Sequence, residues 1–455
     1  MKIAIIAAGA GGMFCGSCIR DNALATELMA EGHDVVLLPI YTPMRTDEEG
    51  VALDHVFYGA VSIYLEQKFP WFARIPRWMR GWLDHPALLR RLPMSSNATN
   101  AKDLGELTLS TLRGEEGRQR AELEHMARWL ADHYQPEVIQ LSNSMLLGFV
   151  RELRRHLPDA RIVCALQGED IFLDDLDEPY RTEVIGMMGE RARECDLFVS
   201  TSVFYAAPMA ELLGIDRDRI VPTRIGIHVP ADDPERQPPP EEPFTIGYLA
   251  RICPEKGLHR LVDAFELLCE RIGAERLRLR VAGYESGRDR QYSAALRQRL
   301  ERSGLSGRVD WLGEVDREQK TAFLRSLHVF SVPTIYHDPK GLPVLEAMAE
   351  AVPVVQPRHG AFPELLERTG GGVLVEPDDA RALADAIERL LRSPEERDEL
   401  GRQGAAGVRR EFTTETMAED TLRAYRRALS SASAVDSVDS VASDDGRAGA
   451  AAGAG

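Results

Sequence analysis

The sequence predicts an α/β protein with two domains, each built on a parallel β-sheet. Short, almost continuously apolar runs alternate with segments of helical period along most of the chain. Such runs are typical of strands buried on both faces, and the alternating helices would supply that cover. The length of 455 residues is enough for two or three domains with cores of their own.

The predicted strands fall into two sets. The first set is Lys2–Ala7, Asp34–Ile40, Glu137–Leu141, Arg161–Leu166 and Asp196–Ser200. The second set is Phe244–Leu249, Leu277–Ala282, Arg308–Leu312, His328–Val332, Pro353–Gln356 and Gly372–Val375. Between the first two strands we expect a helix at about Asp21–Ala30, because Gly32 suits the residue that follows a helix.

Residues 229–243 separate the two sets and hold six prolines. Proline disrupts both helices and central strands, so this stretch is predicted to link two Rossmann-like domains, at 1–228 and 244–410. A last helix is expected at 411–429. The tail at 430–455 is rich in Ser, Ala, Asp and Gly, and we expect it to be disordered.

Residues 58–128 interrupt the alternation of strand and helix. The first part interleaves aromatic residues with arginines, from Phe69 to Trp82. This composition is compatible with an amphipathic lid that contacts a membrane or a large acceptor. It is also compatible with an inserted helical subdomain that packs on its own aromatic residues, which is the interpretation we favour.

Composition narrows the function classes. The net charge of -17 argues against a nucleic-acid partner. The sequence has no apolar run of the roughly 20 residues that a transmembrane helix needs. Six cysteines, several within apolar runs, fit a reducing compartment. We therefore expect a cytoplasmic protein, with peripheral contact at the inner face of the membrane as an open alternative.

The stretch from Asp338 to Ala347 carries the clearest chemical signal. It follows a predicted strand, and a helix is expected to begin near Pro343. The free N–H groups and the dipole of that helix would form an anion site. Gly341 has no side chain and would let a ligand approach this site closely. Asp338 and Glu346 flank this site, where a sugar and a ribose could offer hydroxyl groups to the two carboxylates.

A second motif follows the strand Phe244–Leu249. Arg251 and Lys256 come directly after the carboxyl end of this strand, where ligands bind in open α/β sheets. Arginine grips a diphosphate through two N–H groups and lysine acts as a point charge. The two residues are therefore candidate ligands of a diphosphate.

Residues Phe244 to Leu391 resemble the retaining glycosyltransferases of family 4, which have the GT-B fold. The resemblance rests on Gly-x-x-x-Arg-x-x-x-x-Lys-Gly from Gly247 to Gly257, and on two acids that enclose Gly341-Leu342. Pro353-Val354-Val355, Gly360 with Pro363-Glu364, and Gly372-Val373-Leu374-Val375 follow in the family's order. The resemblance implies two Rossmann-like domains that face a central cleft, with a last helix that crosses back to the first domain.

The resemblance also implies roles on the donor side. Arg251 and Lys256 would hold the donor diphosphate, Glu346 the ribose hydroxyls and Asp338 the transferred sugar. Most of the family has Glu at the position of Asp338. The aspartate side chain is one methylene shorter than glutamate.

Backbone groups complete the implied donor site. Gly341 and Leu342 would present amides to the donor. Gly11, Gly12 and Gly16, in the loop after the first strand, would approach its phosphates from across the cleft.

The residues on the acceptor side differ from the family's sequence pattern. Family histidines are absent after two strands, where Gln140-Leu141-Ser142-Asn143 and Gln167-Gly168-Glu169-Asp170 stand instead. Glutamine does not titrate, so any acid–base role of those histidines is absent or moved. Asn143, Gln167 and Asp170 remain the candidates on this side.

The implied reaction is transfer of a sugar from a nucleoside-diphosphate sugar to an acceptor hydroxyl, with retention at the anomeric carbon. The acceptor could be a glycan, a lipid or a small molecule. Two alternatives remain open, namely another GT-B enzyme such as a sugar-nucleotide epimerase or a phosphorylase, and a non-catalytic sugar-nucleotide-binding protein.

No metal or cofactor is expected. Phe14 stands where a dinucleotide-binding loop needs its third glycine. Cys15 and Cys18 form a single CxxC, without the second pair that a zinc site needs. The acids from Glu169 to Glu178 lack the spacing of a calcium loop.

Overall fold

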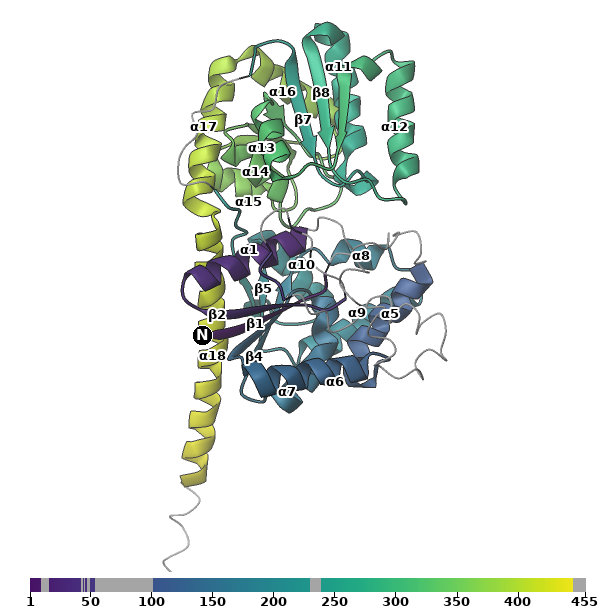
Figure 1. The fold of residues 1–455 in the computed structure, drawn as a ribbon. Helices are drawn as coiled ribbons and strands as arrows, with labels where there is room; N and C mark the ends of the chain where they lie inside the picture. Colours follow the sequence, from purple (N-terminus) through teal and green to yellow (C-terminus); the bar gives the residue numbers. More distant parts are fainter. Residues whose placement is uncertain are drawn as a thin grey trace, which may run out of the picture.

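The computed structural model describes residues 1–9, 16–41, 44, 46, 50–53, 101–229 and 239–444, apart from the side chains of 101–104 and 431–444. These residues form two α/β domains stacked one above the other (Figure 1). The N-terminal domain carries the chain to about residue 223, and the C-terminal domain begins with the strand at Phe244.

The N-terminal sheet has the strand order β2-β1-β3-β4-β5-β6, and all of its neighbouring pairs are parallel. Its strands are β1 (Lys2–Ala7), β2 (Asp34–Pro39), β3 (Val138–Leu141), β4 (Arg161–Leu166), β5 (Leu197–Ser200) and β6 (Ile220–Pro222). The sequence analysis missed β6, because its three residues end in a proline and carry no pattern of their own.

The C-terminal sheet has the order β12-β11-β10-β7-β8-β9 and is also parallel throughout. Its strands are β7 (Phe244–Leu249), β8 (Leu277–Ala282), β9 (Val309–Gly313), β10 (Val329–Phe330), β11 (Val354–Pro357) and β12 (Gly372–Val375). The prediction of two domains with parallel sheets is confirmed.

Helices cover the faces of both sheets. Those of the N-terminal half are α1 (Gly16–Ala30), α5 (Ala101–Arg113), α6 (Arg120–Trp129), α7 (Val150–His156), α8 (Asp170–Asp174), α9 (Tyr180–Ala192) and α10 (Val203–Leu213). Those of the C-terminal half are α11 (Leu258–Ile272), α12 (Arg290–Arg302), α13 (Arg317–Arg325), α14 (Leu342–Ala349), α15 (Phe362–Thr369), α16 (Ala380–Arg392), α17 (Pro394–Glu411) and α18 (Thr414–Asp444). The short helical turns are η3 (Gly114–Glu116), η4 (Leu130–Tyr134), η5 (Ser144–Phe149), η6 (Arg217–Arg219), η7 (Pro254–Lys256), η8 (Ala274–Arg276) and η9 (Ser306–Arg308).

Two apolar clusters sandwich the N-terminal sheet. On one face, Leu24 and Leu28 of α1 pack with Tyr425 of α18 against the strands. On the other face, helices α5, α6, α7, α9 and α10 bury a second cluster. Each face of the sheet is therefore removed from water, as continuously apolar strands require.

Helix α18 returns from the C-terminal domain and runs along the N-terminal one (Figure 1). The Tyr425 hydroxyl donates to Gln140 Oε1 of β3 at 2.8 Å, which fixes the helix on the sheet. The helix extends to Asp444. The backbone of residues 430–444 is thus helical where the sequence analysis expects a disordered tail, and residues 445–455 lie outside the described part.

The chain passes between the domains twice, and the two passages lie against each other. Ile227 N–H donates to Phe412 O at 3.0 Å, and Ile227 forms a parallel bridge with Thr413. Gly226 makes this approach possible, since a Cβ there would lie 2.3 Å from Thr413 O. Most of the predicted linker, residues 230–238, lies outside the described part.

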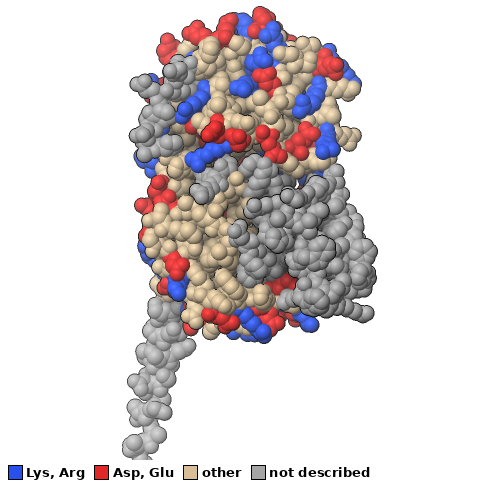
Figure 2. All heavy atoms as spheres, in the orientation of Figure 1, with Lys and Arg blue, Asp and Glu red and all other residues tan. Residues whose placement is uncertain are grey.

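The described part of the insertion, residues 101–128, is helical and packs into the N-terminal core through Leu109, Leu112, Leu123 and Met126. The aromatic and arginine-rich part, with the lid proposed for it, lies outside the described residues. Within the described ranges, no helix combines the length and the hydropathy that crossing a bilayer requires. Figure 2 shows acidic and basic side chains intermingled over the C-terminal domain on this face, without a large region of one sign.

Candidate functional site

The loops that follow β7 and β10 meet at one edge of the C-terminal sheet. The two strands are neighbours, with Phe330 opposite Gly247. Their loops join where Ile335 N–H donates to Glu255 O at 3.0 Å. Gly257 has a φ of +71° and packs so closely that a Cβ there would lie 1.7 Å from Pro333 O. The two motifs singled out from the sequence are therefore side by side.

Lys256 and Asp338 form an ion pair at the centre of these loops. Lys256 Nζ lies 2.7 Å from Asp338 Oδ2 and 2.7 Å from the Tyr336 hydroxyl. Asp338 is 5% exposed, and its other oxygen accepts the N–H groups of Lys340 at 2.9 Å and Gly341 at 3.1 Å. Burial alone would raise the pKa of Asp338, but Lys256 and the two amides together hold it below its usual value.

The turn before α14 is shaped by glycines. Gly341, with a φ of +67°, precedes Leu342, the first residue of the helix. Gly360 packs against the same turn, where a Cβ would lie 2.6 Å from Asp338 O, and Ala361 N–H donates to that oxygen at 2.8 Å. The amides of Lys340 and Gly341 thus bind the Asp338 side chain. The predicted amide role of Gly341 toward a donor would require this contact to change.

Arg251 lies on the loop after β7 and Glu346 in α14, and each has partners of its own. Arg251 Nε donates to Cys253 Sγ at 3.2 Å, and its guanidinium lies 3.7 Å from Glu255. Glu346, one turn into α14, accepts from Lys320 Nζ of α13 at 2.6 Å. Sequence reasoning missed Lys320, because 26 residues separate it from Glu346 and no motif contains it.

The loop before α14 contacts the N-terminal domain. Lys340 Nζ reaches Ser17 Oγ of α1 at 3.0 Å, and the Thr201 hydroxyl donates to Pro339 O at 3.1 Å. Gly16 faces Leu342, whose Cδ1 would lie 3.3 Å from a Cβ at that glycine. Of the predicted glycine loop, Gly16 therefore lies opposite the donor motif, while Gly11 and Gly12 lie outside the described residues.

A second contact joins the domains at the start of α10. Glu364 Oε2 of α15 accepts the backbone N–H groups of Val203 at 3.1 Å and Phe204 at 3.3 Å. A carboxylate is favourable at a helix N-terminus because these amides have no partner within the helix. Arg288 adds an ion pair to Asp175 at 2.8 Å.

The acceptor-side candidates have different environments. Asn143 caps η5 by accepting from Met145 N–H at 3.1 Å. Gln167 is 3% exposed and donates from Nε2 to Ser142 O at 2.7 Å and to Asp21 at 3.1 Å. Both side chains therefore make hydrogen bonds within the N-terminal domain.

Asp170 is more open to the region between the domains. It accepts the Tyr205 hydroxyl at 2.7 Å, and burial raises its pKa. Burial and the nearby Asp338 raise the pKa of Tyr336 in the C-terminal domain, and the charge of Asp170 adds a smaller contribution from across the domain boundary. Among the three acceptor-side candidates, Asp170 is thus the one with an interaction across the domain boundary.

Two buried carboxyl groups were not predicted as part of the site. Burial raises the pKa of Asp21 to about 6, against the lowering effects of Arg20, Gln167 and Lys340. Glu169 is 4% exposed, and burial raises its pKa as well. Both were overlooked because acids at a helix start or in an acidic run are usually solvated.

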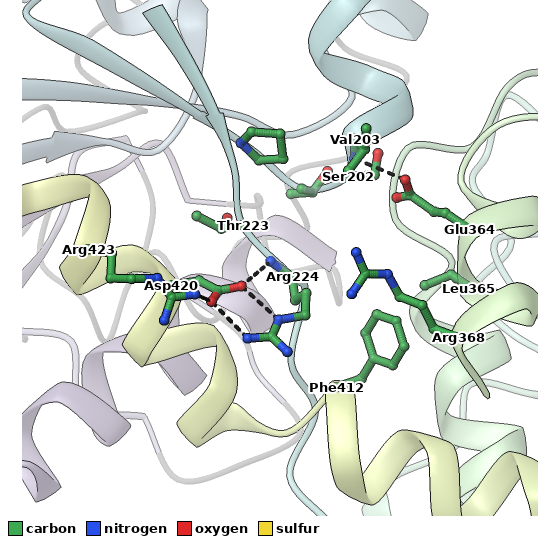
Figure 3. Close-up of a pocket in the computed structure, with 12 residues that line it drawn as sticks. Ser202, Val203, Thr223, Arg224, Glu364, Leu365, Arg368, Phe412, Asp420 and Arg423 are labelled. Atoms are coloured by element: carbon green, nitrogen blue, oxygen red, sulfur yellow. Dashed lines mark hydrogen bonds and ion pairs between the residues drawn. The ribbon is translucent and has the colours of Figure 1, made fainter. Parts of the chain in front are cut away.

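A pocket of about 260 Å³ lies at the passage between the domains (Figure 3). Arg224 and Asp420 form its floor through two contacts of 2.8 and 2.9 Å between guanidinium and carboxylate. Arg368 and Glu364 of α15 line the opposite side. Asp420 pairs with Arg224 and Arg423, Arg368 pairs with Glu411 beside the pocket, and Glu364 binds the amides at the start of α10, so we assign the pocket a structural role.

One group in the described part could hold a metal ion. Glu124, Glu152 and His156, on α6 and α7, bring ligand atoms within 4.8 Å of one another. Glu152 is already paired with Arg155 and His156. Acidic groups of this kind are common without an ion, and this one shares no element with the donor loops.

The arrangement of the two sheets matches known structures over almost the whole chain. HepE from Anabaena, solved with UDP, superposes with a TM-score of 0.62 at 15% identity and covers 93% of this chain and 99% of its own. Sucrose-phosphate synthase from Thermosynechococcus elongatus gives a TM-score of 0.66 at 18% identity, with 94% and 99% covered. The fold is GT-B.

Sequence comparison is most specific for the C-terminal domain. Residues 231–406 match the family described as "Glycosyl transferases group 1". These residues include all of the site residues predicted on the C-terminal domain.

Curated relatives are named as glycosyltransferases. A putative colanic acid biosynthesis glycosyltransferase, WcaL of Escherichia coli, is 29% identical over 260 residues, which are 56% of this chain and 59% of that protein. A phosphatidyl-myo-inositol mannosyltransferase of Mycobacterium leprae is 31% identical over 226 residues, or 50% and 57%. The matches thus span less than two thirds of these relatives' own length.

Proposed function

We propose that this chain is a retaining glycosyltransferase of family 4, which transfers a sugar from a nucleoside-diphosphate sugar to an acceptor hydroxyl. The observation that carries the proposal is the meeting of the loops after β7 and β10, which places Lys256 2.7 Å from Asp338. Arg251 lies on the first of these loops and Glu346 in α14, the helix that follows the second. The match of residues 231–406 to glycosyl transferases group 1 supports the same conclusion.

In the proposed reaction, the bond between the anomeric carbon and the diphosphate oxygen breaks, and a bond from that carbon to the acceptor oxygen forms. The departing diphosphate takes the electron pair of the broken bond, and its oxygen accepts the proton that the acceptor hydroxyl loses. Negative charge therefore grows on the diphosphate. Cations fixed in advance stabilise that charge most in the transition state, which is what lowers the barrier.

Lys256 is suited to this role because its position is already fixed. An ammonium group has three N–H donors. In the described structure two of them are directed to Asp338 and Tyr336, which leaves one for a phosphate oxygen. Asp338 would keep Lys256 in position and would also accept hydrogen bonds from hydroxyls of the transferred sugar. Arg251 would add a second, bidentate contact to the diphosphate.

Glu346 would bind the ribose hydroxyls, as the sequence resemblance implies. A carboxylate accepts hydrogen bonds from two neighbouring hydroxyls. Lys320, at 2.6 Å, would keep Glu346 oriented while the donor enters. This assignment places the nucleoside beside α13 and α14, and the sugar beside Asp338.

The donor class is part of the proposal. HepE has been solved with UDP-glucose, and one relative is named as a mannosyltransferase. A thermal-shift panel should therefore begin with UDP, UDP-glucose and a mannose nucleotide. A ligand that binds only the native state raises the melting temperature by mass action. The donor should stabilise the protein, and its free sugar should not.

Two variants then test the site. Arg251→Ala and Lys256→Ala should each reduce transfer by about 10²–10³-fold, as expected when one group that stabilises developing charge is lost. Arg402→Ala and Lys2→Ala are matched controls outside the site and should keep full activity. If the two site variants transferred sugar at the rate of these controls, the donor assignment would be wrong.

The product identifies the reaction class. Transfer requires that labelled sugar appear on an acceptor and that nucleoside diphosphate be released. Epimerised nucleotide sugar without acceptor, or sugar phosphate formed with inorganic phosphate, would instead show one of the other GT-B activities.

A further inference from the structure

Lys340 bridges the two domains at the centre of the proposed site. Its backbone N–H holds Asp338 Oδ1 at 2.9 Å, whereas its side chain leaves the C-terminal domain and reaches Ser17 Oγ at 3.0 Å. One residue therefore contacts both the carboxylate that pairs with Lys256 and the first turn of α1. The proposed function assigns no role to this side chain.

The ammonium group of Lys340 enters an acidic part of the N-terminal domain. Asp21 lies four residues after Ser17, on the same face of α1, and Glu169 follows β4. Both carboxyl groups are at most 4% exposed, and the charge of Lys340 lowers the pKa of each. Lys340 therefore interacts favourably with both groups.

Apart from Lys340, Asp21 and Glu169 differ in whether a positive charge lies beside them. Asp21 is paired with Arg20 at 3.0 Å. Glu169 accepts hydrogen bonds from the amides of Ser144 and Gln167, and the Tyr205 hydroxyl lies 3.2 Å from it; among the described residues, none of these partners is a cation. A buried carboxylate without a counter-charge is costly, so the approach of Lys340 favours the docked arrangement of the domains.

The packing around Lys340 is also specific. Leu342 lies against Gly16, and a Cβ on that glycine would sit 3.8 Å from Lys340 Nζ and 3.3 Å from Leu342 Cδ1. The start of α1 therefore fits between the Lys340 side chain and the first residue of α14. Separation of the domains would break this contact and release the loop that holds Asp338.

We propose that Lys340 is a positioning residue that couples docking of α1 to the placement of the Asp338–Lys256 pair. When the domains close, the lysine is anchored by Ser17 and the buried carboxylates, and its backbone amide orients Asp338. When the domains separate, that anchor is lost and the loop relaxes. The catalytic part of this proposal rests on the proposed function, whereas the coupling of docking to loop order does not.

The test compares Lys340→Met, which keeps length and loses charge, with Lys340→Arg, which keeps the charge. Lys2→Met is the control for the same substitution at an exposed site outside the interface. Small-angle scattering of the ligand-free protein reports domain separation, and hydrogen exchange of the segment 338–346 reports loop order. Lys340→Met should increase the radius of gyration and speed exchange in that segment, and the other two variants should match the wild type.

Kinetics provide the second readout. Because Arg251 lies outside the loop 338–346 and would still bind the diphosphate, Lys340→Met should lower kcat about tenfold or more and change donor KM less, as expected for misplaced catalytic groups. A wild-type protein without transferase activity would refute the proposed function but leave the scattering and exchange results to decide the coupling. Unchanged scattering, unchanged exchange or an unchanged kcat in an active enzyme would each overturn the proposal.

Discussion

The ion pair between Lys256 and Asp338 offers the sharpest test of how the site is built. Lys256→Met removes the ammonium group and keeps most of the side-chain volume. The Asp338 side chain is 7% exposed, so its carboxylate would lose its counter-charge in a place that water hardly reaches. Breaking a buried pair in this way costs about 3–5 kcal/mol. We expect about 3 kcal/mol at pH 7.5, because Asp338 keeps two backbone N–H donors.

The direction in which the destabilisation of Lys256→Met changes with pH also tests the reasoning. In the wild type the pKa of Asp338 is lowered, so its contribution to stability is present above its unfolded pKa and is lost as the pH falls below it. Without Lys256, burial is the largest remaining influence and should raise that pKa. The destabilisation of Lys256→Met should therefore shrink as the pH is lowered from 7.5 towards 5, because Asp338 then becomes neutral.

Urea unfolding is followed by the fluorescence of Trp311, on β9, in a background in which the other four tryptophans, Trp71, Trp78, Trp82 and Trp129, are replaced by phenylalanine, so that the signal reports the C-terminal domain. Arg402→Met is the control, since its pair with Glu399 is exposed and should contribute less than about 1 kcal/mol. A Lys256→Met variant as stable as this control at pH 7.5, or one equally destabilised at every pH, would refute the reasoning.

Three further substitutions test neighbouring features. Asp21→Asn should remove a pH dependence: because the folded pKa of about 6 is raised, wild-type stability should fall by about 2 kcal/mol between pH 4.5 and pH 8 relative to this variant in chemical denaturation. Gly257→Ala should destabilise the C-terminal domain by at least about 2 kcal/mol, since φ is +71° and the new Cβ would meet Pro333 O at 1.7 Å. A calorimetric melting temperature equal to that of the wild type would contradict this. Arg224→Ala should cost about 2 kcal/mol by leaving Asp420 without its bidentate partner, and Arg224→Lys should restore only part of it.

Most strands could be predicted because their signal is local. A strand buried on both faces is a short apolar run between turn residues, so Lys2–Ala7, Arg161–Leu166 and Phe244–Leu249 were placed with their observed bounds. The helix α18 was cut short in the prediction, because alanines, serines and aspartates after residue 429 indicate weak burial but do not prevent a helical backbone.

The site was only partly predictable for a related reason. Motifs identify which residues lie on one loop or at the start of the helix after it, and Arg251, Lys256, Asp338 and Glu346 were predicted in that way. Motifs do not reveal which side chains pair across long separations. Lys320 is 26 residues from Glu346, and Lys340 is 323 residues from Ser17. Only the fold brings the members of each pair together.

The contacts between the domains suggest how readily the cleft can open. The described contacts of the loop 338–342 with the other domain are mainly hydrogen bonds and the packing of Leu342 on Gly16. Hydrogen bonds of this kind contribute about 0.5–1.5 kcal/mol each, somewhat more when one partner is charged. The loop contacts thus stabilise the docked arrangement by a few kcal/mol, to which Glu364 at the start of α10 and the Arg288–Asp175 pair add, and the differential affinity of a ligand can shift a balance of this size. The paired passages at Ile227 and Thr413 are covalent parts of the chain and would persist when the other contacts break, so opening would pivot there. A donor that touches both Lys256 and the start of α1 would then favour closure and, through Lys340, order the carboxylate that holds Lys256.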